Sequence, residues 1–246
     1  IVEVNEVAGE DRVRKQFFIA KARAVEKEVF EAADAIIVVS NFLKKKIQDL
    51  GVDGNKIHVI PNAADPAIFD PAKCKRNIRQ ELSIPQDAIV MGFVGWFVAW
   101  HNFGLLIEAL GQLKDRNVYL MLVGDGVLKE DIRTLARQHG CLDRLVFPGA
   151  VKHTQMPDYV SAMDICVIPG SNAYRSPIKL FEYMIMGKAT IAPRLEPIEF
   201  VVTDGEHAAL FESGDSRSFV EVALRLASDA ELRERLGRNA REKILQ

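Results

Sequence analysis

The sequence predicts an α/β protein with a Rossmann-like, doubly wound parallel sheet. Short β-branched runs alternate with segments of helical periodicity along the chain, and this alternation is typical of parallel strands joined by right-handed helical crossovers. Some runs, such as 35–39 (AIIVV), are apolar throughout, as in strands buried on both faces. The 246 residues, 48% of them hydrophobic, can form one large domain and part of another.

The pattern of apolar residues in the first 60 positions predicts three strands and two helices. Apolar residues recur at helical spacing in the first helix. Ser40 suits the N-cap of the second helix, and Gly51 suits its end. Three strands are too few for a complete domain, so we expect a fragment of one. The strands are expected at 1–4, 35–39 and 57–60, and the helices at 41–50 and at 11–33, where Val13, Phe17, Phe18, Ala22, Val25 and Val29 form the apolar stripe.

A linker separates this fragment from a second, complete series of elements. The segment 61–75 contains three prolines and shows no apolar period. We therefore predict a partial domain over 1–63, a linker over 64–80 and a complete domain over 81–246. In the complete domain, strands are expected at 88–94, 118–123, 145–147, 165–168, 190–192 and 209–211. Helices are expected at 103–113, 128–139 and 177–186, with one more that ends near residue 163 and two more after residue 216.

Familiar phosphate-binding motifs do not fit the turns of the predicted sheet, where ligands bind at the carboxyl ends of the strands. The Gly-Asp-Gly turn at 124–126 has Lys129 where a dinucleotide fingerprint needs its third glycine, and the turn at Gly92 has Val94 in a glycine position. The pair 187–188 (Gly-Lys) lacks the Ser/Thr and the earlier glycine of a P-loop. A NAD-dependent enzyme and a P-loop ATPase are therefore disfavoured.

The segment 175–182 (RSPIKLFE) is the most informative turn. Pro177 suits the first position of a helix with Ser176 as its N-cap, and the free amides of that first turn attract anions. Arg175 and Lys179 oppose the helix dipole there, so they need a bound anion as compensation, unless they extend into solvent. The residues alone leave both interpretations open.

Two further turns contain glycines. The loop 95–101 (GWFVAWH) follows the first strand of the complete domain and combines a glycine with two tryptophans. The glycines of the turn 124–126 allow the main chain to approach a ligand closely. A tight turn between strand and helix, which needs no ligand, is the favoured alternative for that second turn.

Composition argues against several other classes of protein. The formal net charge of −2 gives no overall attraction to nucleic acid. Cys74, Cys141 and Cys166 form no Cys-x-x-Cys pair, which argues against a disulfide framework and a zinc site. The five histidines are scattered, and no Asp-x-Asp offers a carboxylate pair for Mg²⁺. No apolar run reaches the length that spans a bilayer.

Six short segments resemble the pattern of glycosyltransferase family 4, in the order expected for that family. The resemblance covers essentially the whole chain, and the order of the segments is more specific than any one of them. It implies a GT-B fold, a nucleotide-diphosphate sugar bound by the C-terminal domain, transfer with retention of anomeric configuration, and no metal or other cofactor. The segments are 33–40 (ADAIIVVS), 60–65 (IPNAAD), 92–95 (GFVG), 122–126 (LVGDG), 146–150 (VFPGA) and 176–184 (SPIKLFEYM).

The resemblance also implies roles for individual residues. Lys179 is expected at the donor diphosphate and Glu182 at the ribose hydroxyls, and His101 stands where many members carry a lysine. These three are the expected catalytic residues. Further donor contacts are implied for Gly95, Trp96, Gly124, Asp125, Gly126, Phe147, Gly149, Ala150, Val151, Arg175, Ser176, Pro177, Ile178 and Leu180.

Two positions depart from the family pattern. Tyr174 stands where the family usually carries the first glutamate of a pair, and Trp96 stands where many members carry arginine or serine. The chain instead matches a Ser-Pro-x-Lys version of the motif, so the preference for a sugar does not carry over. A nucleotide-sugar epimerase of the same fold and a non-catalytic nucleotide-sugar-binding or scaffold protein stay open as alternatives.

The resemblance sets expectations about the whole protein. We expect this chain to be the donor-binding C-terminal domain with a fragment of the N-terminal, acceptor-side domain, inactive by itself and with an exposed apolar patch. The donor is expected to be of the UDP, GDP or ADP type, and the acceptor a glycan, a lipid-linked sugar or a small molecule, with no nucleic acid as partner. A cytoplasmic location is expected, and peripheral contact with the inner face of a membrane stays open.

Overall fold

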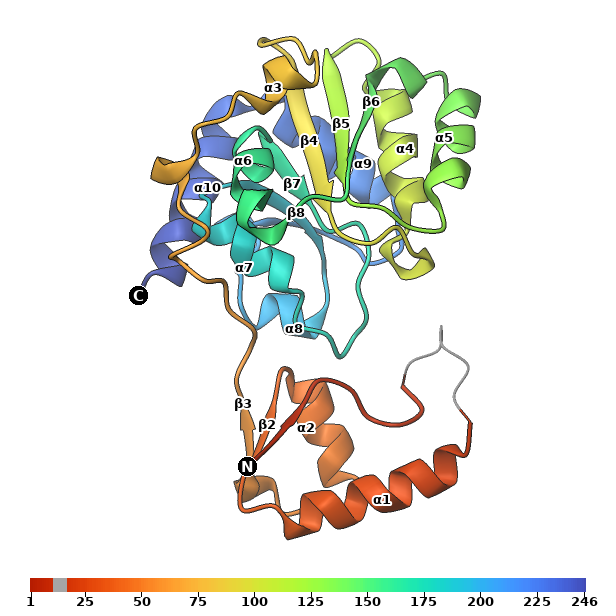
Figure 1. Ribbon diagram of the computed structural model, residues 1–246, viewed down its shortest axis with the longest axis vertical. Coiled ribbons are helices and arrows are strands. Elements are labelled where there is room, and N and C mark those ends of the chain that lie inside the picture. The colour runs from red at the N-terminus through yellow and green to blue at the C-terminus, as the bar shows by residue number, and fades with distance from the viewer. Residues whose placement is uncertain (11–16) are drawn as a thin grey trace. The chain divides into compact units, whose positions relative to one another are not determined.

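The computed structural model describes residues 1–10 and 17–246, which form two compact units (Figure 1). The small unit consists of Ile1–Asn62, Asn172–Pro177 and Leu195–Val201, and the large unit consists of the rest. Two stretches within the predicted range 81–246 thus group with the small unit. Among the described residues, no helix is both long and apolar enough to cross a membrane.

The small unit contains a parallel sheet of three strands in the order β1-β2-β3. Its core is apolar and includes Ile36, Val38, Leu43, Ile47 and Ile57. The structure confirms the predicted strands and the second helix to within two residues. The elements are β1 (Val2–Val4), α1 (Ile19–Ala32), β2 (Ile36–Val38), α2 (Asn41–Gln48), β3 (Ile57–Val59) and the four-residue helix α8 (Glu196–Glu199), which was not predicted.

Helix α1 differs from its prediction in two ways. It begins at Ile19, and most of the predicted first turns, including Val13, lie outside the described residues. The predicted apolar stripe is also not buried, since Phe18, Val25 and Val29 are exposed and Phe30 alone among the α1 residues is buried. Helical spacing shows which side chains share a face but cannot show whether another element covers that face, and here the helix reaches the core of the small unit at its C-terminal end.

The N-cap of α2 was predicted correctly, and it has a second role. The Ser40 hydroxyl accepts a hydrogen bond from the Leu43 amide (3.3 Å) and donates one to the Tyr174 carbonyl (2.9 Å), and Ser40 is buried. Because Ser40→Ala removes both bonds and leaves buried groups unpaired, we expect it to destabilise α2 by about 2 kcal/mol. Faster hydrogen exchange of the α2 amides tests this expectation, with the exposed Ser213→Ala as control; unchanged exchange would contradict it.

The large unit contains a six-stranded parallel sheet in the order β6-β5-β4-β7-β8-β9. This is the strand order of the Rossmann fold, in which the direction of winding reverses between the first and fourth strands. The reversal lies here between β4 and β7, which pair at Met91 and Ile165. The predicted strands are confirmed to within two residues. They are β4 (Ile89–Val94), β5 (Val118–Val123), β6 (Leu145–Gly149), β7 (Ile165–Val167), β8 (Ala189–Pro193) and β9 (Ala209–Phe211).

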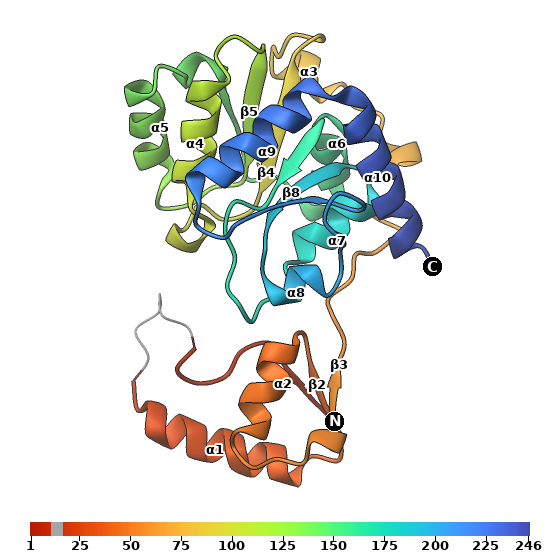
Figure 2. The same cartoon turned by 180° about the vertical axis from the view of Figure 1, so that it is seen from behind.

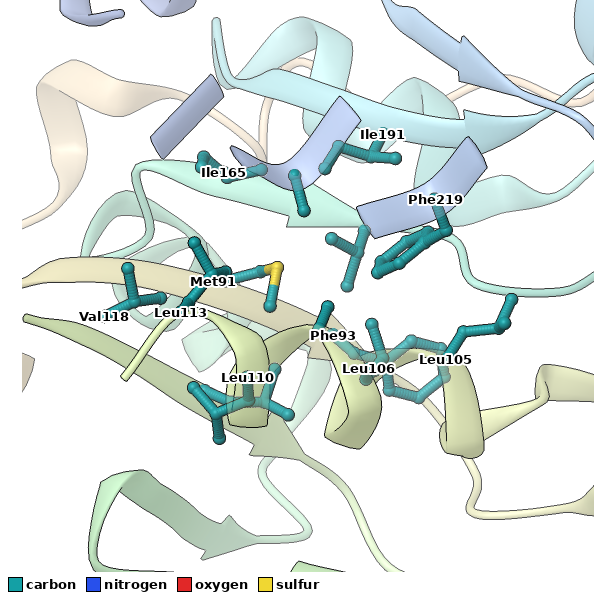
Figure 3. Close-up of a cluster of buried hydrophobic side chains, with 14 of the residues drawn as sticks. Met91, Phe93, Leu105, Leu106, Leu110, Leu113, Val118, Ile165, Ile191 and Phe219 are labelled. Atoms are coloured by element: carbon teal, nitrogen blue, oxygen red, sulfur yellow. The ribbon is translucent and has the colours of Figure 1, made fainter. Parts of the chain in front are cut away.

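Helices cover both faces of this sheet. Figures 1 and 2 show α6 and α7 on one face and α4 and α9 on the other. Leu106 and Leu110 of α4 and Phe219 of α9 pack with Phe93 and Ile191 of the strands in one buried cluster (Figure 3). The short α3 was not predicted. The helices are α3 (Ile78–Glu81), α4 (Phe103–Gln112), α5 (Lys129–Gln138), α6 (Met156–Ser161), α7 (Ile178–Ile185), α9 (Ser216–Ser228) and α10 (Ala230–Ile244).

Candidate functional site

The candidate site lies at the carboxyl ends of β4 and β7, where the winding of the sheet reverses. A crevice forms at this point in open α/β sheets because the loops of neighbouring strands lead to opposite faces. Main-chain hydrogen bonds connect the loops that follow β4, β5 and β6. The Gly95 amide donates to Val123 (3.0 Å), Phe97 donates to Asp125 (2.8 Å), and Gly124 donates to Gly149 (2.9 Å). The edge of the site is therefore held in place by the backbone.

The Gly-Asp-Gly turn after β5 is explained by contact between two loops. Gly124 has φ +138°, and a Cβ there would lie 2.0 Å from the carbonyl oxygen of Gly95. A Cβ at Gly126 would lie 2.5 Å from the Phe97 nitrogen. The Asp125 carboxylate accepts from the Gly126 amide (2.9 Å) within the turn. These glycines are needed for packing, whether or not a ligand also approaches them.

Lys179, in the first turn of α7, reaches the end of β4. Its Nζ lies 4.0 Å from the centroid of the Phe93 ring, and a Cβ at Gly95 would lie 3.0 Å from that nitrogen. Burial lowers the pKa of Lys179 to about 7, although the nearby charge of Glu182 opposes the shift. A lysine that is only partly charged near neutral pH without a bound anion therefore lies at the reversal of the sheet, beside the amides of a helix N-terminus.

His101 approaches the same phenylalanine from the loop after β4. Its ring meets Phe93 edge-on with centroids 4.9 Å apart. Its Nδ1 lies 3.3 Å from the carbonyl oxygen of Gly170, which follows β7. Because a carbonyl oxygen can only accept, Nδ1 carries the proton in this contact and Nε2 is left as the second polar atom of the ring. The structure thus brings together two of the predicted catalytic residues, His101 and Lys179, around Phe93.

Glu182, the third predicted catalytic residue, lies one turn beyond Lys179 and is buried with 6% of its surface exposed. Its Oε1 lies 3.1 Å from Nε2 of His153. The His153 ring also contacts Phe69 edge-on at 5.2 Å. No sequence pattern indicated His153, because its partner is 29 residues away and the two share no element.

The remaining predicted donor contacts in the large unit differ in exposure. Trp96 is 73% exposed and Ile178 is 53% exposed. Leu180 is fully buried, so its side chain belongs to the core and its main chain alone can face a ligand. The Phe147 ring meets the Phe97 ring edge-on, with centroids 6.0 Å apart. Gly149 ends β6 and is followed by an exposed residue and a half-buried one, Ala150 and Val151.

The predicted contacts Arg175, Ser176 and Pro177 belong to the small unit. Arg175 forms an ion pair with Glu6 at 3.6 Å. The Ser176 hydroxyl accepts from the Asn62 amide (3.2 Å), and the Ser176 carbonyl accepts from the Asn62 side chain (2.6 Å). This serine therefore stabilises a connection within the small unit. Helix α7 begins at Ile178, one residue later than predicted.

Tyr174, which stands where the family pattern has a glutamate, packs in the core of the small unit. It is 4% exposed and belongs to the apolar core of that unit. Its ring lies 6.2 Å from Phe42, and the Arg175 guanidinium lies 5.6 Å from the ring centroid. A buried tyrosine with these neighbours stabilises the fold where a glutamate was expected to contact a sugar.

The three cysteines of the chain all lie within the described residues, and none of them forms a disulfide. Cys74, Cys141 and Cys166 are free. Burial raises the pKa of the Cys166 thiol to about 12, so it stays protonated near neutral pH. Within residues 1–10 and 17–246, no group of three or more His, Cys, Asp or Glu side chains is placed to hold a metal ion. The polar groups that the structure brings to the site are those of Lys179, His101, His153 and Glu182, together with the first amides of α7.

Comparisons with known proteins agree on one class. The family described as "Glycosyl transferases group 1" matches residues 75–243, and the one described as "Glycosyltransferase Family 4" matches residues 10–68. The lipopolysaccharide core biosynthesis glycosyltransferase LpsD of Rhizobium meliloti is 32% identical over 85% of this chain and 58% of its own length. The D-inositol 3-phosphate glycosyltransferase of Xylanimonas cellulosilytica is 25% identical over 88% of this chain and 54% of its own. The chain thus spans little more than half the length of these relatives.

Solved structures show the same fold. Anabaena HepE in complex with UDP superposes with a TM-score of 0.85 at 19% identity, over 99% of this chain and 66% of HepE. Sucrose-phosphate synthase of Thermosynechococcus elongatus gives a TM-score of 0.82 at 23% identity, over 99% of this chain and 62% of its own. The predicted Rossmann-like fold of the GT-B type is confirmed by these similarities.

Proposed function

The chain belongs to the group 1 glycosyl transferases, and from this premise we propose that it carries the nucleotide-sugar-binding half of a retaining glycosyltransferase. The observation that carries the proposal is the position of Lys179 against Phe93 and Gly95, at the reversal of the sheet and in the first turn of α7. A buried ammonium beside a helix N-terminus is suited to a diphosphate, because both supply positive charge in a place of low dielectric.

The diphosphate is the leaving group of the proposed reaction. As the bond between the sugar and the diphosphate breaks, negative charge grows on the diphosphate, and Lys179, His101 and the α7 amides stabilise it. These groups supply the positive charge for which other transferases use a metal ion. Trp96, which replaces an arginine or serine of the family pattern, leaves more of this task to Lys179 and His101.

The acceptor is proposed to attack from the face that the diphosphate leaves. The acceptor hydroxyl gives its proton to a diphosphate oxygen, its oxygen forms the new bond to the anomeric carbon, and the bond to the diphosphate breaks, so the anomeric configuration is retained. Relatives named for lipopolysaccharide core biosynthesis favour a lipid-linked glycan as the acceptor. An inverted product, seen by NMR of the anomeric proton after transfer by the longer protein, would contradict this step.

Binding of nucleotides tests the donor site directly. In calorimetric titrations of this chain with UDP, GDP and ADP, we expect one nucleotide to bind with a micromolar to millimolar Kd. Glu182→Ala is expected to weaken that binding about tenfold, because a ribose hydroxyl loses its charged acceptor. Glu212→Ala, an exposed change outside the site, serves as control. Unchanged binding in Glu182→Ala would contradict the proposed role of Glu182.

The alternatives make different predictions. A nucleotide-sugar epimerase would convert the donor sugar without an acceptor, and a non-catalytic binding protein would bind the nucleotide without turnover. The burial of Tyr174 in the core of the small unit is the observation that favours the non-catalytic protein, since it replaces an expected sugar contact. Transfer by the longer protein that depends on an added acceptor would exclude both.

A further inference from the structure

We propose that His153 is a positioning residue that holds the Glu182 carboxylate for a ribose hydroxyl and so makes the site selective for ribonucleotides. The inference rests on the proposed function, because it assigns a helper to the donor carboxylate. Its basis is the hydrogen bond of 3.1 Å between His153 Nε2 and Glu182 Oε1, which joins the loop after β6 to helix α7.

Glu182 needs this partner because of where it lies. Its side chain is 9% exposed, whereas that of His153 is 59% exposed. A buried carboxylate without donors is costly, and it relieves the cost by taking up a proton or by changing its rotamer. Among the described residues, His153 provides the one hydrogen bond that the structure shows to the Glu182 carboxylate. It fixes the orientation of the carboxylate.

His153 is itself held by two neighbours. Its ring meets Phe69 edge-on at 5.2 Å and 65°, and Phe69 is 1% exposed. Its backbone begins the short 3₁₀ turn His153–Gln155, where the Met156 amide donates to the His153 carbonyl. Packing against Phe69 therefore holds the imidazole on one side, and the turn fixes the main chain that carries it, although the side chain is 59% exposed.

The arrangement has a consequence for recognition. A carboxylate has two oxygens, and the bond from His153 engages Oε1, so Oε2 is the oxygen that we assign to the ribose hydroxyl. Ribose presents hydroxyl donors that match a fixed carboxylate oxygen, whereas a dideoxyribose presents none. A site with a buried acceptor discriminates strongly against a ligand without the matching donor, because the acceptor is left unpaired.

Two variants separate the hydrogen bond from the ring contact. His153→Phe keeps an aromatic ring against Phe69 and removes the donor. His153→Gln removes the ring and keeps an amide donor near the position of Nε2. For each variant and the unchanged chain, Kd is measured calorimetrically for the nucleoside diphosphate that binds best among UDP, GDP and ADP, and for its 2′,3′-dideoxy counterpart. Circular dichroism confirms the fold of each variant.

We expect the unchanged chain to prefer the ribonucleotide about tenfold or more. His153→Phe is expected to reduce the preference to about threefold, because it weakens binding of the ribonucleotide. The Kd for the dideoxy compound is expected to stay within about twofold of its value in the unchanged chain. His153→Gln is expected to keep most of the preference. If His153 had a merely structural role, its replacement would weaken binding of both ligands equally and leave the ratio of their Kd values unchanged.

The outcomes distinguish this inference from the proposed function. An unchanged preference in His153→Phe overturns the role of His153, and so does tighter ribonucleotide binding, which would mean that His153 competes with ribose. Equal binding of both ligands by the unchanged chain overturns the inference and the ribose role of Glu182, while the diphosphate site stands. Binding of neither ligand overturns the proposed function itself.

Discussion

The affinity of this chain for a nucleotide sugar is expected to fall about tenfold for each pH unit above pH 7, and Lys179 is the group responsible. Burial lowers the pKa of Lys179 to about 7 in the absence of ligand. A bound diphosphate favours the charged lysine and so raises that pKa in the complex. Between the two pKa values binding takes up a proton, and each pH unit then costs about 1.4 kcal/mol of binding free energy.

The sign of the effect follows from the direction of the two shifts. Below pH 7 the lysine is charged in the free and the bound chain, so the contribution to affinity is fully present. As the pH rises above 7, the free chain loses the proton that the complex needs, and the contribution is lost until the bound lysine also titrates. A nucleotide sugar is the right ligand for this measurement, because its diphosphate is esterified at both ends and does not titrate near neutrality.

Variants at Lys179 provide the controls. Lys179→Met is expected to bind about 100-fold more weakly than the unchanged chain at pH 6 and to show no slope above pH 7, since the charged contact is gone. Lys179→Arg is expected to bind without that slope, because a guanidinium stays charged. His101 meets the same Phe93 ring and His153 contacts Glu182, so His101→Gln and His153→Gln are measured as well; both should keep the slope above pH 7.

A flat profile from pH 7 to 9 would contradict the prediction. It would mean that Lys179 is already fully charged without ligand or that it does not meet the diphosphate. Lys179→Met separates these explanations. A large loss of affinity at every pH in Lys179→Met would show that Lys179 contacts the diphosphate and is already charged without ligand. No loss would show that Lys179 does not contact the diphosphate.

The strands and most helices could be predicted because their signal is local. A parallel strand that is buried on both faces needs consecutive apolar residues, and β5 (Val118–Val123) and β9 (Ala209–Phe211) were predicted with the bounds that the structure shows. The cap at Ser40 is also local, because its acceptor and its donor are three residues apart. The apolar stripe of α1 was misjudged because burial depends on a neighbouring element, which helical spacing does not report.

The positions of the candidate site residues could be predicted in part from local signals, whereas the roles expected of Glu182 and His101 came from the resemblance to a family. Lys179 and Glu182 share one helix at a spacing of three, and the rule that ligands bind at strand ends places the loop of His101 beside them. His153 could not be found, because a hydrogen bond across 29 residues leaves no pattern in the sequence. The core position of Tyr174 depends on packing against Phe42, 132 positions earlier in the chain, which no local rule reveals.

Gly124→Ala is expected to destabilise the large unit by at least about 3 kcal/mol. Gly124 has a φ of +138°, which residues with a side chain rarely adopt, and the added methyl would lie 2.0 Å from the carbonyl oxygen of Gly95. The clash is with backbone, so the loop after β4 must move as a whole, and backbone strain adds to the cost. His101 lies in that loop, so nucleotide binding is expected to weaken as well.

Gly140→Ala is the matched control for this effect. Gly140 also has a positive φ, +62°, but a methyl there would meet no atom within 4 Å, so we expect a cost of about 1 kcal/mol from backbone strain alone. Urea unfolding followed by tryptophan fluorescence compares the two, because both tryptophans of the chain, Trp96 and Trp100, lie in the loop after β4. Equal losses in the two variants would show that the close approach of the two loops adds nothing to stability. A larger loss in Gly124→Ala, together with weaker nucleotide binding, would show that the contact between these loops both stabilises the sheet edge and holds His101 at the site.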